Sequence, residues 1–492
     1  MKKTISAVLA ILALLLVFSS AVSAESYTYT RSGEAVVSPD AYIPSANVTL
    51  SADGISATSP QDIFFSDDGR VLVADTGNNR ILILDSTLTK ISAVSSLKDK
   101  DGNLYTLNAP EGVFAAKDGM LYIADTGNHR LLCCDSELNV FLVVEKPKGL
   151  VGIAEDASFN PTKVLVDSSG RIYVVARNYN LGILQLDPKG NFVGYIGAPK
   201  VQYNLLEMLW RSISTEEQLS KMEQYVPTEY NNIALDHEGF VWGTIGTLDR
   251  DKLKSTITSG DTSGTVTPIT KLNTNGSDVL KRNGAHAPLG DLDYEKEPSK
   301  IIDVATMESG IYAMLDSTLG HIFMYDDNGN LLCIFGKNGN GAYDFSQVSS
   351  CTFCGDDLLV LDALFGRITV FSPSDYGKRL LSAARYQYDG DFDKAYAVWS
   401  EVAGQNRNLE YAFVGLGQSY CNEGEYEKAM DCFSYADDKE NYSKAKFLLR
   451  KENMKTVFPV IFISIICIAV VVFVFGIGRK FYRYAKGYSR EE

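Results

Sequence analysis

Histidine is scarce in this 492-residue chain, which contains four. They lie far apart in the sequence, at His129, His237, His286 and His321. A catalytic zinc takes three protein ligands, often histidines, and we do not expect three of these to meet. The sequence also contains neither a serine nucleophile elbow nor a cysteine with an assignable base. It therefore gives catalysis no support, and we predict no catalytic residues.

The cysteines also lack the pattern of a disulfide scaffold. There are eight, and Cys467 lies in an apolar run near the C-terminus, which leaves an odd number elsewhere. Cys351 and Cys354 form a CxxC without the second pair that a structural zinc needs. We interpret the cysteines as small apolar residues, with at most one disulfide bridge.

Positive charge is in deficit, because 61 acidic residues outnumber 46 basic ones and give a net charge of −15. Without the two terminal segments described next, the remainder carries about −20. Such a surface repels phosphate backbones, so we expect no nucleic-acid partner.

Both ends of the chain carry membrane-related signals. Lys2 and Lys3, an apolar run and the small residues Val22 and Ala24 predict a signal peptide over residues 1–24. Residues 457–477 contain no charged side chain and would span ~30 Å as a helix, which predicts one transmembrane segment. The basic tail, residues 478–492, places the C-terminus in the cytoplasm and the rest outside the cell membrane.

Two heptapeptides, ADTGNNR (74–80) and ADTGNHR (124–130), belong to a longer repeat. The unit at 60–85 realigns with 110–135 and more weakly with 161–187, and related units begin near residues 230, 301 and 350. Each unit alternates apolar and polar residues between Gly, Asn and Asp turns, which is typical of antiparallel strands. Four strands repeated six times predict a mainly β protein with a six-bladed β-propeller over residues 25–377. We expect residues 27–39 to supply the outer strand that the last unit lacks.

The sequence Asn128-His129-Arg130-Leu131 and the two heptapeptides resemble the NHL-repeat family, which is named for an Asn-His-Leu signature. The resemblance implies a propeller in which each heptapeptide joins two neighbouring strands of a blade. A carboxylate and a cation five residues apart would face each other across this hairpin, and Gly77 and Asn78 would supply positive φ angles. We favour this structural role over a ligand loop for four pairs: Asp75/Arg80, Asp125/Arg130, Asp316/His321 and Asp362/Arg367.

After the propeller, residues 385–399 realign with residues 419–433 at a spacing of 34. This is the period of the tetratricopeptide repeat (TPR), and the residues at 413, 416, 417, 420, 429, 433 and 436 resemble its packing pattern. The resemblance implies a short helical stack over residues 378–452 that docks a protein partner. We expect a further helix, from about residue 443 to 451, to cap the stack and to lead toward the membrane.

Ligand-binding residues are predicted where the units depart from the common pattern. Unit three has ARNYNLG in place of the heptapeptide, and two inserts, a helical one at 201–226 and a polar one at 245–267, crowd the same rim. Arg177, Asn178 and Tyr179 lie in the altered loop, and Trp210 of the helical insert would cover it. Aromatic and polar groups of this kind suit a carbohydrate or a peptide.

A second candidate site is the mouth of the propeller channel. The third residue of each first strand should lie nearest the axis, which gives Asp62, Gly112, Lys163, Asn232, Asp303 and Ser349. This ring could bind a polar ligand, or a hard cation such as Ca²⁺ through Asp62, Asn232 and Asp303. The alternative is that the channel mouth is filled by solvent and binds no ligand. Apart from this Ca²⁺ ion, we expect no cofactor.

The sequence thus leaves two functions open. The first is a membrane-anchored extracellular binding or scaffold protein. The second is a metal-dependent hydrolase or lyase that resembles the lactonase-like propellers, for which Glu111 beside the ring is the matching carboxylate.

Overall fold

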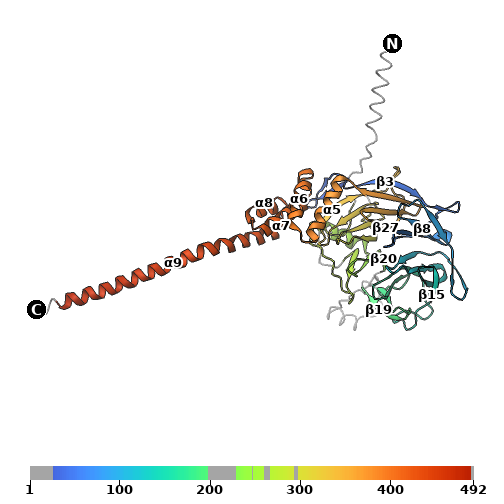
Figure 1. Cartoon of the computed structure of the whole chain (residues 1–492), viewed down its shortest axis with the longest axis horizontal. Helices are drawn as coiled ribbons and strands as arrows, with labels where there is room; N and C mark the ends of the chain where they lie inside the picture. The colour runs from blue at the N-terminus through green and yellow to red at the C-terminus, as the bar shows by residue number, and fades with distance from the viewer. Residues whose placement is uncertain (1–25, 198–228, 247, 260–265, 293–296, 489–492) are drawn as a thin grey trace, which may run out of the picture.

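The computed structural model describes residues 26–197, 229–246, 248–259, 266–292 and 297–488. Six β-sheets surround a common axis and form a propeller, and a helical region follows it (Figure 1). The predicted fold class, a mainly β six-bladed propeller with a C-terminal helical region, is therefore confirmed. The predicted signal peptide and the helical insert with Trp210 lie outside the described residues.

Each blade runs from an inner strand a to an outer strand d. Blade one contains β6 (Asp62–Phe65), β7 (Arg70–Asp75), β8 (Arg80–Asp85) and β9 (Ile91–Val94). Blade two contains β12 (Gly112–Ala115), β13 (Leu121–Asp125), β14 (Arg130–Cys134) and β15 (Asn139–Val144), with the hairpin β10 (Ser96–Asp99) and β11 (Leu104–Thr106) outside it. Blade three contains β16 (Pro161–Val166), β17 (Ile172–Ala176), β18 (Ile183–Leu186) and β19 (Phe192–Ile196).

The remaining blades are less uniform. Blade four has three strands: β20 (Tyr230–Leu235), β21 (Val241–Ile245) and β22 (Ile269–Leu272). Blade five contains β23 (Ile301–Thr306), β24 (Tyr312–Asp316), β25 (Ile322–Tyr325) and β26 (Leu331–Phe335). Blade six contains β27 (Val348–Cys354), β28 (Asp357–Asp362) and β29 (Arg367–Pro373). The second strands of blades two to five, β13, β17, β21 and β24, are buried along their whole length, because neighbouring blades cover both of their faces.

The strand that completes blade six is β3 (Tyr42–Thr49), which pairs antiparallel with β29. The prediction that residues 27–39 would do so is wrong. Within that segment, β1 (Tyr27–Tyr29) and β2 (Ala35–Val37) form a hairpin that extends blade five, with Tyr27 opposite Ile334. Both segments alternate apolar and polar residues, but β3 is eight residues long and pairs along the whole of β29. A short hairpin could not cover that edge.

The helical region consists of α5 (Asp375–Tyr388), α6 (Phe392–Gln405), α7 (Glu410–Glu423), α8 (Tyr426–Tyr435) and α9 (Lys439–Tyr488). The 34-residue repeat places equivalent residues in equivalent roles. Gly390 and Gly424 follow their helices with φ angles of 76° and 81°, the left-handed conformation that ends a helix. Trp399 and Phe433 are buried, and the helix backbone approaches them closely at Gly415 and Gly417.

The propeller has two unlike faces. The lower face carries the turns between strands a and b and between strands c and d, and the helices pack on it. Tyr411 donates a hydrogen bond to Asp326 of blade five, and Arg385 pairs with Asp356 of blade six. One hydrophobic cluster includes Ala313 and Leu358 of these blades together with Trp399. The propeller and helices α5 to α8 therefore share a core.

The upper face carries the loops between strands b and c and the connections from strand d to the next blade. The b–c loop of blade four contains α4 (Arg250–Ser259), within the polar insert predicted at 245–267. On the other side, α9 extends away from the helical region (Figure 1). Among the described residues, α9 is the one helix that is long and apolar enough to cross a membrane.

Candidate functional site

The heptapeptide loops of blades one and two are held together by internal ion pairs. Arg80 Nε lies 2.7 Å from Asp75 Oδ2, and both side chains are buried. Asp75 also accepts a hydrogen bond from the Thr58 backbone N–H, and Arg80 donates to the carbonyl oxygens of Ala52 and Ile55. In blade two, Arg130 Nε lies 2.8 Å from Asp125 Oδ2. These contacts tie each hairpin to the connection that precedes its blade, which leaves Asp75 and Arg80 no free polar group for a ligand.

The turn inside each loop differs from the expected one. Residues 76–78 and 126–128 form one turn of 3₁₀ helix, and the positive φ angles fall on the next residues, Asn79 (56°) and His129 (58°). Gly77 is needed for a different reason: a Cβ atom there would lie 2.6 Å from the carbonyl oxygen of Thr58. The prediction that Gly77 and Asn78 supply the positive φ angles is therefore wrong.

The other two expected pairs have different partners. Asp316 accepts hydrogen bonds from Ser299, from the backbone N–H groups of Lys300 and Thr318, and from that of Leu319. His321 lies instead 3.4 Å from Asp291, which the hairpin residues Tyr27 and Tyr29 also contact. Burial opposes ionisation of Asp291, but the hydrogen bonds from His321 and the two phenols outweigh it and lower its pKa to about 2.

In blade six, Asp362 caps its own turn through the N–H groups of Leu364 and Phe365. Arg367 donates to the carbonyl oxygens of Ala342 and Asp344. The predicted pairs Asp316/His321 and Asp362/Arg367 are therefore wrong, because backbone N–H groups, and for Asp316 also the Ser299 hydroxyl, already donate to each carboxylate.

The buried ion pair of blade one leads to a prediction. Asp75→Ala should lower the free energy of unfolding by about 3 kcal/mol, because it leaves the Arg80 guanidinium buried without a carboxylate. Chemical denaturation of the full-length protein measures the change. Asp68→Ala is the matched control: Asp68 pairs with Arg70 in the same blade, but their side chains are 46% and 29% exposed. We expect less than about 1 kcal/mol there. Equal losses in both variants would contradict a structural role for the heptapeptide.

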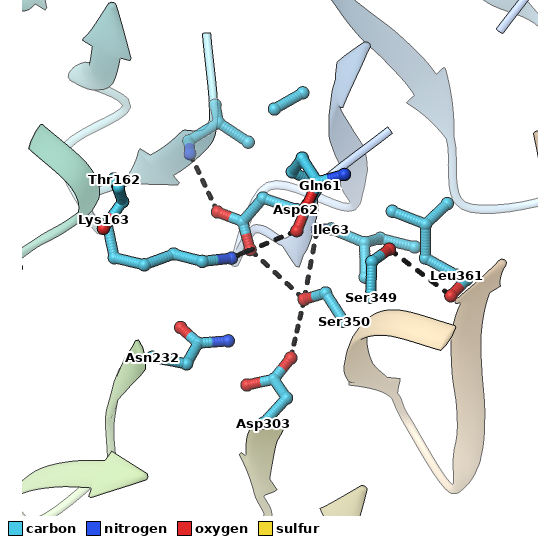
Figure 2. Close-up of polar contacts among 12 residues, drawn as sticks. Gln61, Asp62, Ile63, Thr162, Lys163, Asn232, Asp303, Ser349, Ser350 and Leu361 are labelled. Atoms are coloured by element: carbon cyan, nitrogen blue, oxygen red, sulfur yellow. Dashed lines mark hydrogen bonds and ion pairs between the residues drawn. The ribbon is translucent and has the colours of Figure 1, made fainter. Parts of the chain in front are cut away.

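Part of the predicted ring forms a network at the axis, in which Lys163, Asp62 and Asp303 are linked and Asn232 lies beside them (Figure 2). Lys163 of blade three reaches across blade two to blade one, where its Nζ lies 2.5 Å from Asp62 Oδ1. Gly112 makes room for this, because a Cβ atom there would lie 2.5 Å from the carbonyl oxygen of Thr162 and 3.0 Å from the Cα of Lys163. The other oxygen of Asp62 accepts from the Val113 N–H at 2.9 Å.

Asp303 closes the ring with a serine that the alignment missed. Ser350 Oγ donates to Asp303 Oδ2 at 2.6 Å and lies 3.2 Å from Asp62 Oδ1, whereas Ser349 bonds the carbonyl oxygen of Pro60. In blade six, the register between β27 and β28 shifts between Val348 and Ser350. The register between strands a and b shifts in the same way just before Lys163, Asn232 and Asp303 in blades three, four and five. Ser350 is therefore the equivalent residue, and the choice of Ser349 is one position wrong.

The ring is buried, and its polar groups bond either one another or nearby backbone N–H groups. Asp62, Lys163, Asn232 and Asp303 are each at most 8% exposed. Asn232 Oδ1 accepts from the N–H of Ile233, and Asp303 accepts from those of Val304 and Cys351. Burial raises the pKa of Asp303 to about 6, although Lys163 nearby acts to lower it.

This chemistry does not fit Ca²⁺ well, because the ammonium group of Lys163 lies where a cation would contact Asp62. In the described part of the chain, no group of three or more His, Cys, Asp or Glu side chains is arranged to hold a metal ion. Glu111, the carboxylate that resembled a lactonase residue, is paired with Arg177 at 2.6 Å. We interpret the ring as the structural centre of the propeller.

The altered loop of blade three presents two exposed residues and one buried residue. The Arg177 side chain is 59% exposed while paired with Glu111. Asn178 takes the left-handed conformation with a φ of 66° and is exposed. Tyr179, in contrast, is 4% exposed and packs against Phe159, with ring centroids 6.1 Å apart. Sequence alone could not show this burial, because Phe159 comes from the connection between blades two and three.

Comparison with protein families identifies one segment of the propeller. Residues 58–84 match the NHL repeat model, and they run from the start of blade one through its heptapeptide to strand c. A comparison with curated proteins gives no match.

Several solved structures are similar to this chain at low identity. Virginiamycin B lyase from Staphylococcus aureus is 11% identical, with a TM-score of 0.40 and coverage of 68% of this chain and 100% of that one. The β-propeller domain of Cps50 (Swd1) from Myceliophteria thermophila is 10% identical, with a TM-score of 0.38 and coverage of 67% and 100%. A protein of unknown function from Bacteroides thetaiotaomicron is 11% identical, with a TM-score of 0.41 and coverage of 67% and 72%. At these values the similarity bears on neither ligand nor reaction.

Proposed function

We propose that this chain is a membrane-anchored binding protein whose propeller captures a ligand outside the cell membrane. The observation that carries the proposal is the contrast between the two faces of the propeller. Helices cover the lower face over blades five and six, while the loops that depart from the repeat, Arg177–Tyr179 and α4, lie on the upper face over blades three and four. Loops that vary on a rigid scaffold are where binding residues concentrate.

The rest of the chain would hold this face at a fixed position. We infer that α9 crosses the membrane, with residues 1–24 removed as a signal peptide and the basic end of α9 in the cytoplasm. Helices α5 to α8 would act as a TPR stack that docks a protein partner beside the bilayer. Because these helices share a core with the propeller, a ligand and a partner would be held in a fixed relation.

The lactonase-like alternative has weaker support. It needs a cation at the axis, and there Asp62 already pairs with Lys163 while Glu111 pairs with Arg177. Binding therefore remains the function that the site geometry favours.

Charge reversal on each face tests the proposal. The full-length protein in lipid nanodiscs would be screened against neutral and charged glycans and against peptides, and binding measured by calorimetry. We expect Arg177→Glu to weaken binding at least tenfold, because Arg177 is exposed on the upper rim. Lys189→Glu, in an exposed c–d turn of the same blade on the lower face, is the control and should bind normally. Unchanged binding in both variants would contradict an upper-face site.

A further inference from the structure

The first turns of α9, which lead from the helical region to the apolar run at 457–477, have a charge opposite to that of the whole chain. Residues 439–456 contain six basic and two acidic residues, a net charge of +4, whereas the chain carries −15. The basic segment and the apolar run belong to the same helix, which extends away from the propeller (Figure 1). With α9 across a membrane, the basic segment stands at the bilayer surface on the side of the propeller.

Two lysines and two apolar residues share one side of this segment. Lys451 and Lys455 are four residues apart, and so are Met454 and Phe458, so each pair occupies successive turns of the same side. At 3.6 residues per turn, the four residues fall within an arc of about 100°. Met454 and Phe458 are 55% and 58% exposed, and both lysines are exposed. We refer to these four residues as the α9 face.

The α9 face meets the bilayer at the level of the lipid headgroups. At ~1.5 Å per residue, Lys455 lies about 3 Å and Lys451 about 9 Å outside Val457, the first residue of the apolar run. The headgroup layer is ~5–8 Å thick on each side of a bilayer, and a charge acts over ~8 Å at physiological ionic strength. Both ammonium groups therefore reach the headgroups, while Met454 and Phe458 lie at the boundary with the acyl chains.

The lysines of this face have no protein partner that competes with a lipid. In the described part of the chain, neither Lys451 nor Lys455 makes an ion pair. The two lysines farther from the bilayer are engaged: Lys444 pairs with Glu440 at 2.6 Å, and the Lys446 ammonium lies 5.8 Å from the centre of the Tyr442 ring. The free cations are thus the two nearest to the apolar run.

We propose that the α9 face binds anionic phospholipids of the bilayer that α9 crosses. The two ammonium groups donate hydrogen bonds to phosphate oxygens, and Met454 and Phe458 pack against the upper acyl chains. A zwitterionic lipid fits less well, because its own cation repels the lysines. An acidic protein segment would match the lysines but leave the two apolar side chains without a partner.

This inference rests on the proposed membrane anchoring and adds the lipid class to it. Bound headgroups would fix the depth and tilt of α9, because interfacial anchors of this kind set the orientation of a membrane helix. The helical region and the propeller share a core, so the upper face of the propeller would be held at a set orientation to the membrane.

Local fluorescence quenching tests the proposal. The full-length protein with Phe462→Trp as reporter would be placed in phosphatidylcholine vesicles that contain either brominated phosphatidylglycerol or brominated phosphatidylcholine. Phe462 stacks on Phe458 with ring centroids 5.9 Å apart, so the reporter lies one turn deeper beside the α9 face. Bromine quenches only at short range, which excludes lipids at the basic tail, ~30 Å away across the bilayer. The protein without the reporter gives the background from the native tryptophans.

We expect brominated phosphatidylglycerol to bind beside the reporter about tenfold more tightly or better than brominated phosphatidylcholine, because each lysine near the surface favours anionic lipid about fivefold. Lys451→Gln with Lys455→Gln should reduce this preference to about threefold or less. The melting temperature should not change, since both side chains are exposed. Lys444→Gln with Lys446→Gln is the matched control: it removes the same charge ~17–20 Å from the apolar run and should keep the preference within about twofold.

The outcomes separate this inference from the anchoring on which it rests. Equal quenching by the two brominated lipids in the parent would leave the anchoring standing and overturn the lipid preference. An unchanged preference in Lys451→Gln with Lys455→Gln, or an equal loss in both double variants, would also overturn the α9 face as the binding surface. If neither brominated lipid quenched the reporter, α9 would not lie in the bilayer, and both proposals would fail.

Discussion

A chain that begins at Leu50, and so lacks β3, should fail to form a stable propeller. The truncation removes the outer strand of blade six and leaves the whole of β29 as an unpaired edge. It also removes Tyr42, which is 1% exposed, stacks on Phe335 with centroids 4.8 Å apart and donates to the carbonyl oxygen of Asp356. An exposed edge strand is a template for aggregation. We expect aggregation or loss of a cooperative melting transition, measured by light scattering and circular dichroism.

A chain that begins at Ser38 is the matched control, because it keeps β3 and loses the β1–β2 hairpin. That hairpin ties blade five to the helices, since the Arg31 N–H donates to Glu410 and Asn408 bonds the carbonyl oxygen of Val37. The control should therefore melt earlier than the parent but still cooperatively. Within β3, Tyr42→Ala alone should cost about 3–5 kcal/mol. If the chain from Leu50 melted like the parent, closure by β3 would be wrong.

The repeat pattern was sufficient to predict the propeller. Each strand alternates apolar and polar residues within its own sequence, and the turns between strands carry glycine. It also predicted which residues meet at the axis, since the register of strand a is part of the repeat. Asp62, Lys163 and Asp303 accordingly lie together. Their role was harder to predict. Lys163 reaches Asp62 only because Gly112 on the intervening blade lacks a side chain, a relation between three blades that no single repeat contains.

Two of the errors share a physical cause, which is competition from groups distant in the sequence. His321 pairs with Asp291 once the β1 hairpin adds Tyr27 beside it, and Tyr179 is buried by Phe159 of the preceding connection. The N-terminal segment offered two alternating stretches, and length rather than pattern determined which one closes the ring. Ser350 was missed because the last unit was aligned one residue too early; the register shift that Lys163, Asn232 and Asp303 also show falls between Val348 and Ser350.

The largest single-residue effect at the axis is expected for Lys163→Met. Lys163 is 8% exposed and lies against Asp62, with Asp303 nearby. The variant keeps the volume of the side chain and removes its charge, so two buried carboxylates lose their cation. Loss of one partner from a buried pair costs about 3–5 kcal/mol. We expect that decrease in the free energy of unfolding near pH 8, measured by denaturant titration of the full-length protein.

The penalty should depend on pH in a definite direction. Burial raises the pKa of Asp303 from 3.8 to about 6, so its contribution to stability is fully present below pH 3.8 and is lost as the pH rises through 6. Without Lys163, which lowers this pKa, the loss becomes larger and extends to higher pH. The difference between variant and parent should therefore grow from pH 5 to pH 8, and Asp303→Asn in the Lys163→Met background should remove much of that growth. Lys117→Met is the control, because the side chains of Lys117 and Asp67 are 82% and 66% exposed. It should change the free energy of unfolding by less than about 1 kcal/mol.

A different result would contradict the structural role of the ring. If Lys163→Met were as stable as the parent at pH 8 but bound saccharide or cation more weakly, the ring would be a ligand site.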